Sequence, residues 1–123
     1  MSGLGAALLL GLSGCGKSDE DQAYKSVRTP KEAASQLEQA FANASPEVKQ
    51  DASLAAQAMR AGEYEKAVLS LQAVRSSGSV NLQQGLAIHS SIVALENKLV
   101  SAMEAGDPNA KRAYELLRQI KRN

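Results

Sequence analysis

From about residue 29 onward, apolar residues recur every three or four positions, as they do along one face of an α-helix. No alternating or continuous apolar run typical of a strand follows residue 20. The pattern therefore predicts an all-α domain over residues 29–123, with its helices packed as antiparallel hairpins. We expect five helices, over about residues 30–44, 46–61, 63–77, 81–106 and 108–121.

The boundaries of these helices are marked by capping residues. Three prolines each follow a residue that favours the N-cap position, in the pairs Thr29-Pro30, Ser45-Pro46 and Asp107-Pro108. Glu32 completes a capping box with Thr29, and Gln84 does so with Asn81 at the start of the fourth helix. Three glycines lie where helices are expected to end: Gly62, Gly78 and Gly106.

Each predicted helix carries an apolar stripe that we expect to face a common core. In four of them the stripe is single, with the members Ala33, Leu37, Ala40, Phe41 and Ala44; Val48, Ala52, Ala55 and Met59; Tyr64, Ala67, Val68, Leu71 and Val74; and Ala110, Ala113, Tyr114, Leu117 and Ile120. The fourth helix adds Leu86 and Val93 on a second face to a first face of Ile88, Ile92, Leu95, Leu99 and Met103. Because a wide apolar arc is typical of a buried helix, we expect this helix to be central.

The first residues follow a different pattern. Leu4 to Leu12 form an uncharged apolar run of about 9 residues, whereas a membrane-spanning helix needs about 20. The run leads directly into Leu12-Ser13-Gly14-Cys15, and polar residues follow from Lys17 to Gln22. This length and this order are typical of the core of an export signal peptide.

Leu12-Ser13-Gly14-Cys15 resembles the lipobox of bacterial lipoproteins, in which the Cys thiol accepts a diacylglycerol group and the chain is cleaved just before it. The resemblance implies a signal peptide over residues 1–14, lipidation of Cys15 and a flexible tether over 15–28. It also implies that Gly16, rather than Asp, directs the protein to the outer membrane on the periplasmic side. Met1-Ser2-Gly3 lacks the Lys or Arg that opens a signal peptide, and a start codon further upstream would account for this.

The same letters support an alternative. Gly11 to Ser18 match the G-x-x-x-x-G-K-[ST] phosphate-binding loop, in which Lys17 would reach the β/γ-phosphates and Ser18 would hold Mg²⁺. Such a loop belongs to a parallel sheet, and three carboxylates directly follow it, Asp19, Glu20 and Asp21, which would repel a polyphosphate. We therefore favour the lipobox, with a P-loop nucleotide-binding protein and an unprocessed cytosolic helical adaptor as alternatives.

Part of the helical domain is similar to the helix-turn-helix of a tetratricopeptide repeat, through Ala55, Met59, Gly62-Glu63-Tyr64, Ala67 and Leu71. The similarity covers about one repeat, and the residues 34 positions after Gly62 and Ala67 do not continue it. A weaker sequence similarity is seen between Met59-Arg-Ala-Gly-Glu63 and Met103-Glu-Ala-Gly-Asp107. It predicts two similar helical hairpins packed together rather than a tandem array.

The composition limits the chemistry that we expect. One Cys and one His exclude a disulfide framework and zinc sites of the Cys₂His₂ or His₃ kind. A net charge of +1 provides no field that would attract nucleic acid, and an aromatic content of 3% predicts a core of small side chains without a deep pocket. We therefore expect no catalytic, cofactor-binding or metal-binding residues, and a protein that is not an enzyme.

His89, with Ser90 and Ser91 beside it, is the arrangement closest to a catalytic one. Adjacent helix positions do not face each other, and no Asp is placed to orient the imidazole, so we do not expect a triad. His89 shares a helix face with Leu82, Leu86 and Val93. We expect it to be a half-buried packing residue.

The last predicted helix is basic and provides the best candidate for a binding surface. Its charged residues beyond the first turn are Lys111, Arg112, Arg118, Lys121 and Arg122 against the single acid Glu115. Either the cations bind an anionic partner, such as lipid, cell-wall polymer or an acidic protein face, or they complement the negative end of the helix dipole. Taken together, the sequence predicts a membrane protein anchored by lipid at Cys15, whose helical domain binds a protein partner.

Overall fold

The computed structural model describes residues 28–122, which form five helices and no strand. They are α2 (Pro30–Ala40), α3 (Pro46–Ala61), α4 (Tyr64–Arg75), α5 (Leu82–Glu104) and α6 (Pro108–Arg122). The all-α prediction is therefore confirmed. The predicted signal peptide over 1–14, the lipidation site Cys15, the tether up to residue 27 and the phosphate-loop letters Gly11–Ser18 lie outside the described residues.

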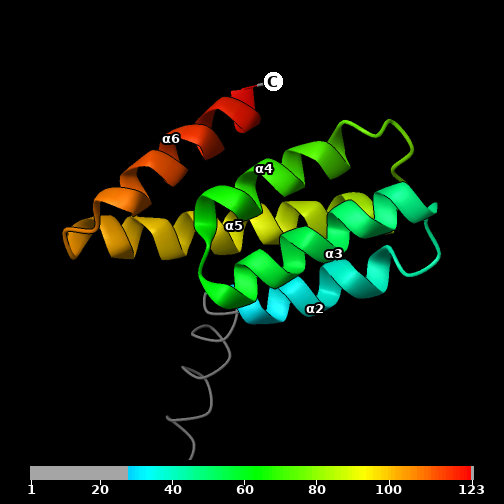
Figure 1. The fold of residues 1–123 in the computed structure, drawn as a ribbon, viewed down its shortest axis with the longest axis horizontal. Helices are drawn as coiled ribbons and strands as arrows, with labels where there is room; N and C mark the ends of the chain where they lie inside the picture. Colours follow the sequence, from blue (N-terminus) through cyan, green and yellow to red (C-terminus); the bar gives the residue numbers. More distant parts are fainter. Residues whose placement is uncertain (1–27, 123) are drawn as a thin grey trace, which may run out of the picture.

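The helices pack as consecutive antiparallel hairpins (Figure 1). Helix α3 lies between α2 and α4 and contacts both of them. Helix α5 runs behind this layer, where it packs on α2 and α4, and α6 folds back to contact α5 and α4. The long α5 therefore joins α2 to α6, and α4 contacts both α5 and α6.

Two capping boxes start helices as the sequence predicts. The Oγ1 atom of Thr29 accepts a hydrogen bond of 3.2 Å from the backbone N–H of Glu32, whose carboxylate accepts one of 3.0 Å from the N–H of Thr29. These bonds from Thr29 hold the pKa of Glu32 below its ordinary value. Asn81 and Gln84 make the same reciprocal pair at the start of α5, at 2.8 and 3.0 Å.

The two other predicted N-caps differ from each other. Asp107 Oδ1 accepts a hydrogen bond of 2.9 Å from the backbone N–H of Asn109, so it caps α6. Ser45 precedes Pro46 in extended backbone, but its side chain makes no capping hydrogen bond within the described residues. Pro46 itself, with its preset φ angle, therefore marks the start of α3 without help from the Ser45 hydroxyl.

Helix α2 ends at Ala40, so the predicted end at residue 44 is wrong. Phe41 is the C-cap, with φ −105° and ψ 13°, and residues 42–45 form the turn to α3. A helix cannot continue through Ser45, because the residue before a proline is disfavoured in helical conformation. The chain also needs these residues to reverse its direction so that α3 can pack against α2. The remaining helix ends lie within two residues of their predicted positions.

The turns α3–α4 and α5–α6 are built in the same way, as the likeness of their sequences suggests. After α3, the N–H of Glu63 donates to the carbonyl of Ala58 at 2.9 Å, while Gly62 has a left-handed φ of 77°. After α5, the N–H of Asp107 donates to Ala102 at 3.1 Å around Gly106. This hydrogen-bond pattern satisfies carbonyl groups at the helix end and needs a positive φ, which favours glycine.

The core is formed by small and aliphatic side chains from all five helices. Its largest fully buried members are Phe41, Leu37, Met59, Leu71, Leu95, Leu99 and Leu117. Most of the residues predicted for the core are buried, and Ala40, Ala44, Val48, Tyr64, Met103 and Tyr114 are partly buried against it. No helix among residues 28–122 is long and apolar enough to cross a membrane.

The prediction of a wholly central α5 is wrong on one side. Leu86 is 55% exposed and Val93 is only partly buried, whereas Ile88, Ile92, Leu95 and Leu99 on the first face are buried. Helix α5 contacts three other helices, but these cover one side of it. The second apolar face therefore lies at the surface of the described domain.

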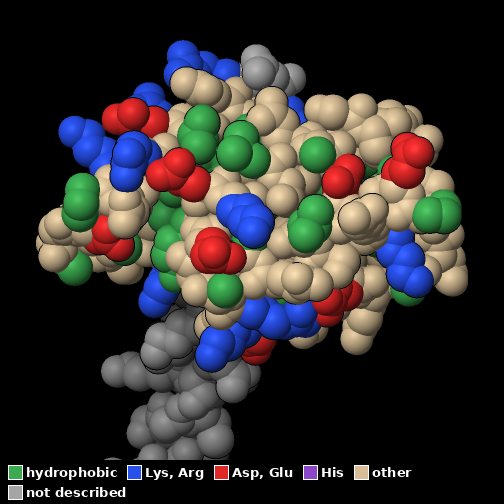
Figure 2. Space-filling model, viewed as in Figure 1, with side chains coloured by type: hydrophobic (Ala, Val, Ile, Leu, Met, Phe, Trp, Pro, Cys, Tyr) green, Lys and Arg blue, Asp and Glu red, His purple; other side chains and the backbone are tan. Residues whose placement is uncertain are grey.

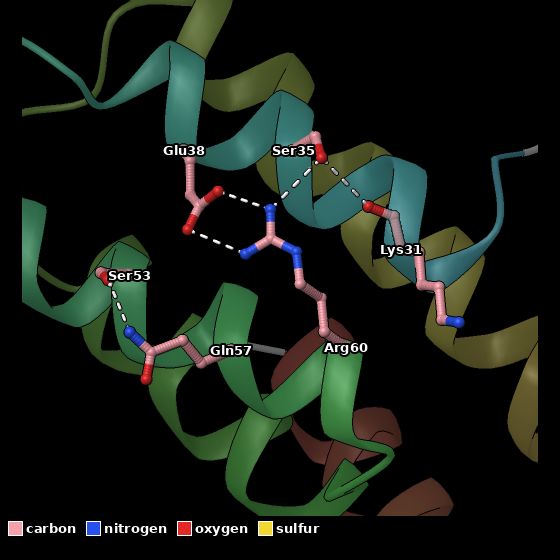
Figure 3. A network of polar contacts seen from close by, with 6 residues as sticks. All are labelled: Lys31, Ser35, Glu38, Ser53, Gln57 and Arg60. Carbon is pink, nitrogen blue, oxygen red and sulfur yellow. Dashed lines mark hydrogen bonds and ion pairs between the residues drawn. The ribbon is translucent and has the colours of Figure 1, made fainter.

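Polar contacts between side chains tie α3 to α2 (Figure 3). The guanidinium of Arg60 bonds both carboxylate oxygens of Glu38, at 2.9 and 2.5 Å, and also donates to the hydroxyl of Ser35 at 3.2 Å. The fork of the guanidinium matches the two carboxylate oxygens, which makes this the most specific ion pair of the described residues. It joins α3 to α2 at the surface of the domain.

Candidate functional site

The serine and histidine side chains on α5 do not form a catalytic arrangement. Ser91 is fully buried, and its hydroxyl donates a hydrogen bond of 2.9 Å to the carbonyl of Ala87 in the same helix. His89 is exposed, so the expectation that it is half-buried is wrong. It is exposed because its face of α5, with Leu86 and Val93, is the face that no described helix covers.

Histidine, aspartate and glutamate side chains do not gather into a metal-binding group within the described part of the chain. The surface depressions are shallow. One lies at the α3–α4 turn and the start of α6, lined by Gly62, Glu63, Tyr64, Glu65, Lys66, Asp107 and Asn109. Another lies between the α2–α3 and α4–α5 connections, lined by Ala44, Ser45, Val48, Gly78, Ser79, Val80, Asn81 and Gln84.

The basic residues of α6 divide into two groups. Lys121 bonds Glu96 of α5 at 2.7 Å, which raises the pKa of Lys121, and the Nε atom of Arg112 lies 3.5 Å from Glu65 of α4. These two cations therefore join α6 to its neighbours, which is a structural role that spacing along α6 alone does not reveal.

The other three cations, Lys111, Arg118 and Arg122, make no ion pair within residues 28–122. They lie on one face of α6 at the spacing i, i+7 and i+11, and Glu115 lies among them at i+4. Figure 2 shows the resulting mixture of basic and acidic side chains along the edge formed by α6. The basic surface is therefore smaller than the five cations of the sequence suggest.

The structure shows a second candidate surface, which the sequence does not predict. It consists of Leu82, Leu86, His89, Val93 and Val100, which we call the α5 outer face. Leu82 is 80% exposed and Val100 is 36% exposed. The signal for it lies in the sequence, because the chain from Ser76 to Leu95 has no Asp, Glu, Lys or Arg. Such apolar character predicts burial, and only the packing of the helices shows that this side of α5 stays exposed.

Comparison with known proteins provides no relative from which a role could be transferred. No protein-family model, no curated protein and no solved structure matches this chain.

Proposed function

We propose that this chain is a lipid-anchored protein of the bacterial cell envelope, in which a non-enzymatic helical domain binds other molecules. The observation that carries the proposal is the order of the first residues: an apolar run of signal-peptide length, then the lipobox letters Leu12-Ser13-Gly14-Cys15, then a polar stretch. Acyl chains on Cys15 would form the anchor, because each buried CH₂ contributes about 0.8 kcal/mol to membrane binding. The outer membrane, facing the periplasm, is the proposed location.

The start of the folded domain suits such an anchor. The first capped helix begins at Pro30, and Thr29 is the fourteenth residue after Cys15. An extended chain of this length spans at most about 50 Å. A domain attached in this way would be able to meet partners away from the lipid surface.

The structure also bears on the P-loop alternative. A phosphate-binding loop of the Gly11–Ser18 kind connects a strand of a parallel sheet to a helix, whereas residues 28–122 form five helices. This favours the lipobox over the phosphate-binding loop as the interpretation of residues 11–18. Nucleotide binding that is lost in a Lys17→Ala variant would support the P-loop alternative instead, and a full-length protein with a free Cys15 thiol would support the cytosolic adaptor.

The decisive experiment is an intact-mass measurement on protein taken from membranes of the native host. We expect the loss of residues 1–14 and the added mass of acyl chains on Cys15. A Cys15→Ser variant should keep its N-terminal segment and leave the membrane fraction. Water-soluble wild-type protein with an unmodified thiol would refute the lipid anchor.

The partner is proposed to include an anionic surface that meets Lys111, Arg118 and Arg122, the cations of α6 that make no ion pair in the described part of the chain. Binding should weaken steeply as salt rises, because exposed charges are screened over about 8 Å at physiological ionic strength. We would sediment the protein with anionic vesicles and with isolated cell wall. Replacing Lys111, Arg118 and Arg122 by Ala should abolish binding, while the ion-paired residues Arg112 and Lys121 provide a matched control. Equal binding by the two variants would show that Lys111, Arg118 and Arg122 do not form the binding surface.

A further inference from the structure

The α5 outer face is a straight apolar stripe opposite the core side of the helix. Its members follow Leu82 at intervals of 4, 7, 11 and 18 residues, a spacing that keeps side chains on one side of an α-helix. Leu82 and Leu86 are 80% and 55% exposed, next to the exposed His89. Several exposed large apolar residues in one row are typical of a binding surface rather than of scattered surface residues.

The two ends of α5 are electrostatically unbalanced. The first turn has no acidic residue and the last turn has no basic residue, and Glu104 is the final residue of the helix. A carboxylate is unfavourable near the negative C-terminal end of a helix and favourable near the positive N-terminal end. Glu104 lies on the same side of α5 as the outer face, 22 residues after Leu82.

We propose that the α5 outer face binds a second copy of this chain, with the two α5 helices antiparallel and a two-fold axis at Val93. In this register Val93 packs on the partner's Val93, and Leu86 packs on the partner's Val100. Each Glu104 then lies at the positive N-terminal end of the partner's α5, beside the partner's Leu82. His89 faces the partner's Asn97, so each residue of the stripe has a neighbour on the partner helix.

The electrostatics select the antiparallel arrangement. A parallel pair would place Glu104 beside the partner's Glu104 and would leave both positive helix ends together without a carboxylate. The 23 residues of α5 span about 34 Å, so one helix face forms an interface at the small end of the range for specific pairs. The dimer is therefore weak and depends on protein concentration.

A membrane surface is a different occupant, and the composition of the face argues against it. Helices that lie on membranes carry Lys and Arg beside their apolar face. The chain from Ser76 to Leu95, which includes the two most exposed leucines of α5, has neither residue. The self-association test below separates the two occupants, because it is done without lipid.

The test uses disulfide cross-linking of the full chain in a Cys15→Ser background, which removes the only other thiol. Val93→Cys should form a covalent dimer rapidly under a mild oxidant, because the two thiols meet at the axis. Leu86→Cys alone should stay monomeric, because position 86 of one protomer and position 86 of its partner lie about 21 Å apart along the paired helices. This distance is beyond the reach of a disulfide. Mixing Leu86→Cys with Val100→Cys should restore the cross-link.

Leu69, 52% exposed on α4, supplies the matched control. Leu69→Cys should not cross-link. In a separate measurement by sedimentation equilibrium, Leu86→Glu should raise the dimer dissociation constant about tenfold or more, whereas Leu69→Glu should not. The proposal would be overturned if Val93→Cys stays monomeric and the mixture of Leu86→Cys with Val100→Cys stays monomeric as well. Equal cross-linking at every position, Leu69 included, would overturn it as well. Because Cys15 is absent, neither result depends on the lipid anchor.

Discussion

The guanidinium of Arg75, at the end of α4, donates a hydrogen bond of 2.8 Å to the carbonyl oxygen of Ile120 in the last turn of α6. The last carbonyl groups of a helix have no partner within the helix, and a cation near them is favoured by the helix dipole. The residues lie 45 positions apart in the sequence. Arg75 therefore caps the final helix from another part of the chain.

We predict that Arg75→Ala lowers the free energy of unfolding by about 1–2 kcal/mol, because it leaves a partly buried carbonyl without its charged donor. Arg118→Ala provides the control, since Arg118 is an exposed cation of α6 without an ion pair in the described range. We expect the control to change stability by less than about 0.5 kcal/mol. Urea denaturation followed by circular dichroism measures both, and equal effects would contradict the capping role.

The Glu38–Arg60 pair predicts a loss of stability in acid. The hydrogen bonds from Arg60, followed by its charge, hold the pKa of Glu38 below its ordinary value of 4.5. A group whose pKa is lowered on folding contributes its full stability above the unfolded pKa. That contribution is lost as the pH falls through the lower, folded pKa.

Stability should therefore decline below about pH 4.5 by more in the wild type than in Glu38→Gln. The difference should be at most about 1 kcal/mol, because both side chains are more than a third exposed to solvent. Urea denaturation at pH 7 and pH 3 measures it. Glu115→Gln, an acid without an ion pair in the described domain, should retain the acid sensitivity of the wild type.

The difference between two N-caps gives a further prediction. Thr29→Ala removes a side chain that caps α2 and should cost about 1 kcal/mol of stability. Ser45→Ala removes a hydroxyl that makes no capping hydrogen bond, and it should cost clearly less. Thermal melting of the two variants compares them directly. An equal cost would mean that Ser45 caps α3 in solution.

Leu99, near the C-terminal end of α5, is fully buried in the core. Leu99→Ala should cost about 2–5 kcal/mol, because removing a buried aliphatic side chain leaves a cavity. Leu69→Ala, at an exposed position of α4, should change stability by no more than about 0.5 kcal/mol. Denaturant midpoints for the two variants measure this contrast, and a small effect of Leu99→Ala would place that residue outside the core.

Several features of the fold were predictable because they depend on neighbouring residues only. The capping boxes at Thr29 and Asn81 and the glycine turns at Gly62 and Gly106 are confirmed, since each involves hydrogen bonds within a few residues of the chain. Helix α3 begins at Pro46 with Ser45 at the N-cap position, as predicted, but the Ser45 side chain makes no capping hydrogen bond within the described residues. A serine before a proline is able to cap a helix with its hydroxyl, but the conformation of the preceding turn decides whether that hydrogen bond forms.

The surface was less predictable, because the residue type of an apolar side chain does not show whether another helix packs on it. Leu86, His89 and Val93 were expected to be buried or half-buried, and two of them are exposed because no described helix packs on that side. The basic residues of α6 were treated as one group, and ion pairs to Glu65 and Glu96 divide them. The lipid anchor at Cys15 stays a prediction from sequence.

The positions of the helices in this domain and, for most of them, the side that faces inward follow from local patterns in the amino-acid sequence. Helix periodicity and caps act over a few residues and are therefore written locally in the chain. The tertiary structure alone decided that Arg75 caps α6, that Arg60 joins α3 to α2, and that one apolar face of α5 stays at the surface. These features depend on which helices become neighbours, and that follows from the packing of the whole core rather than from any local segment.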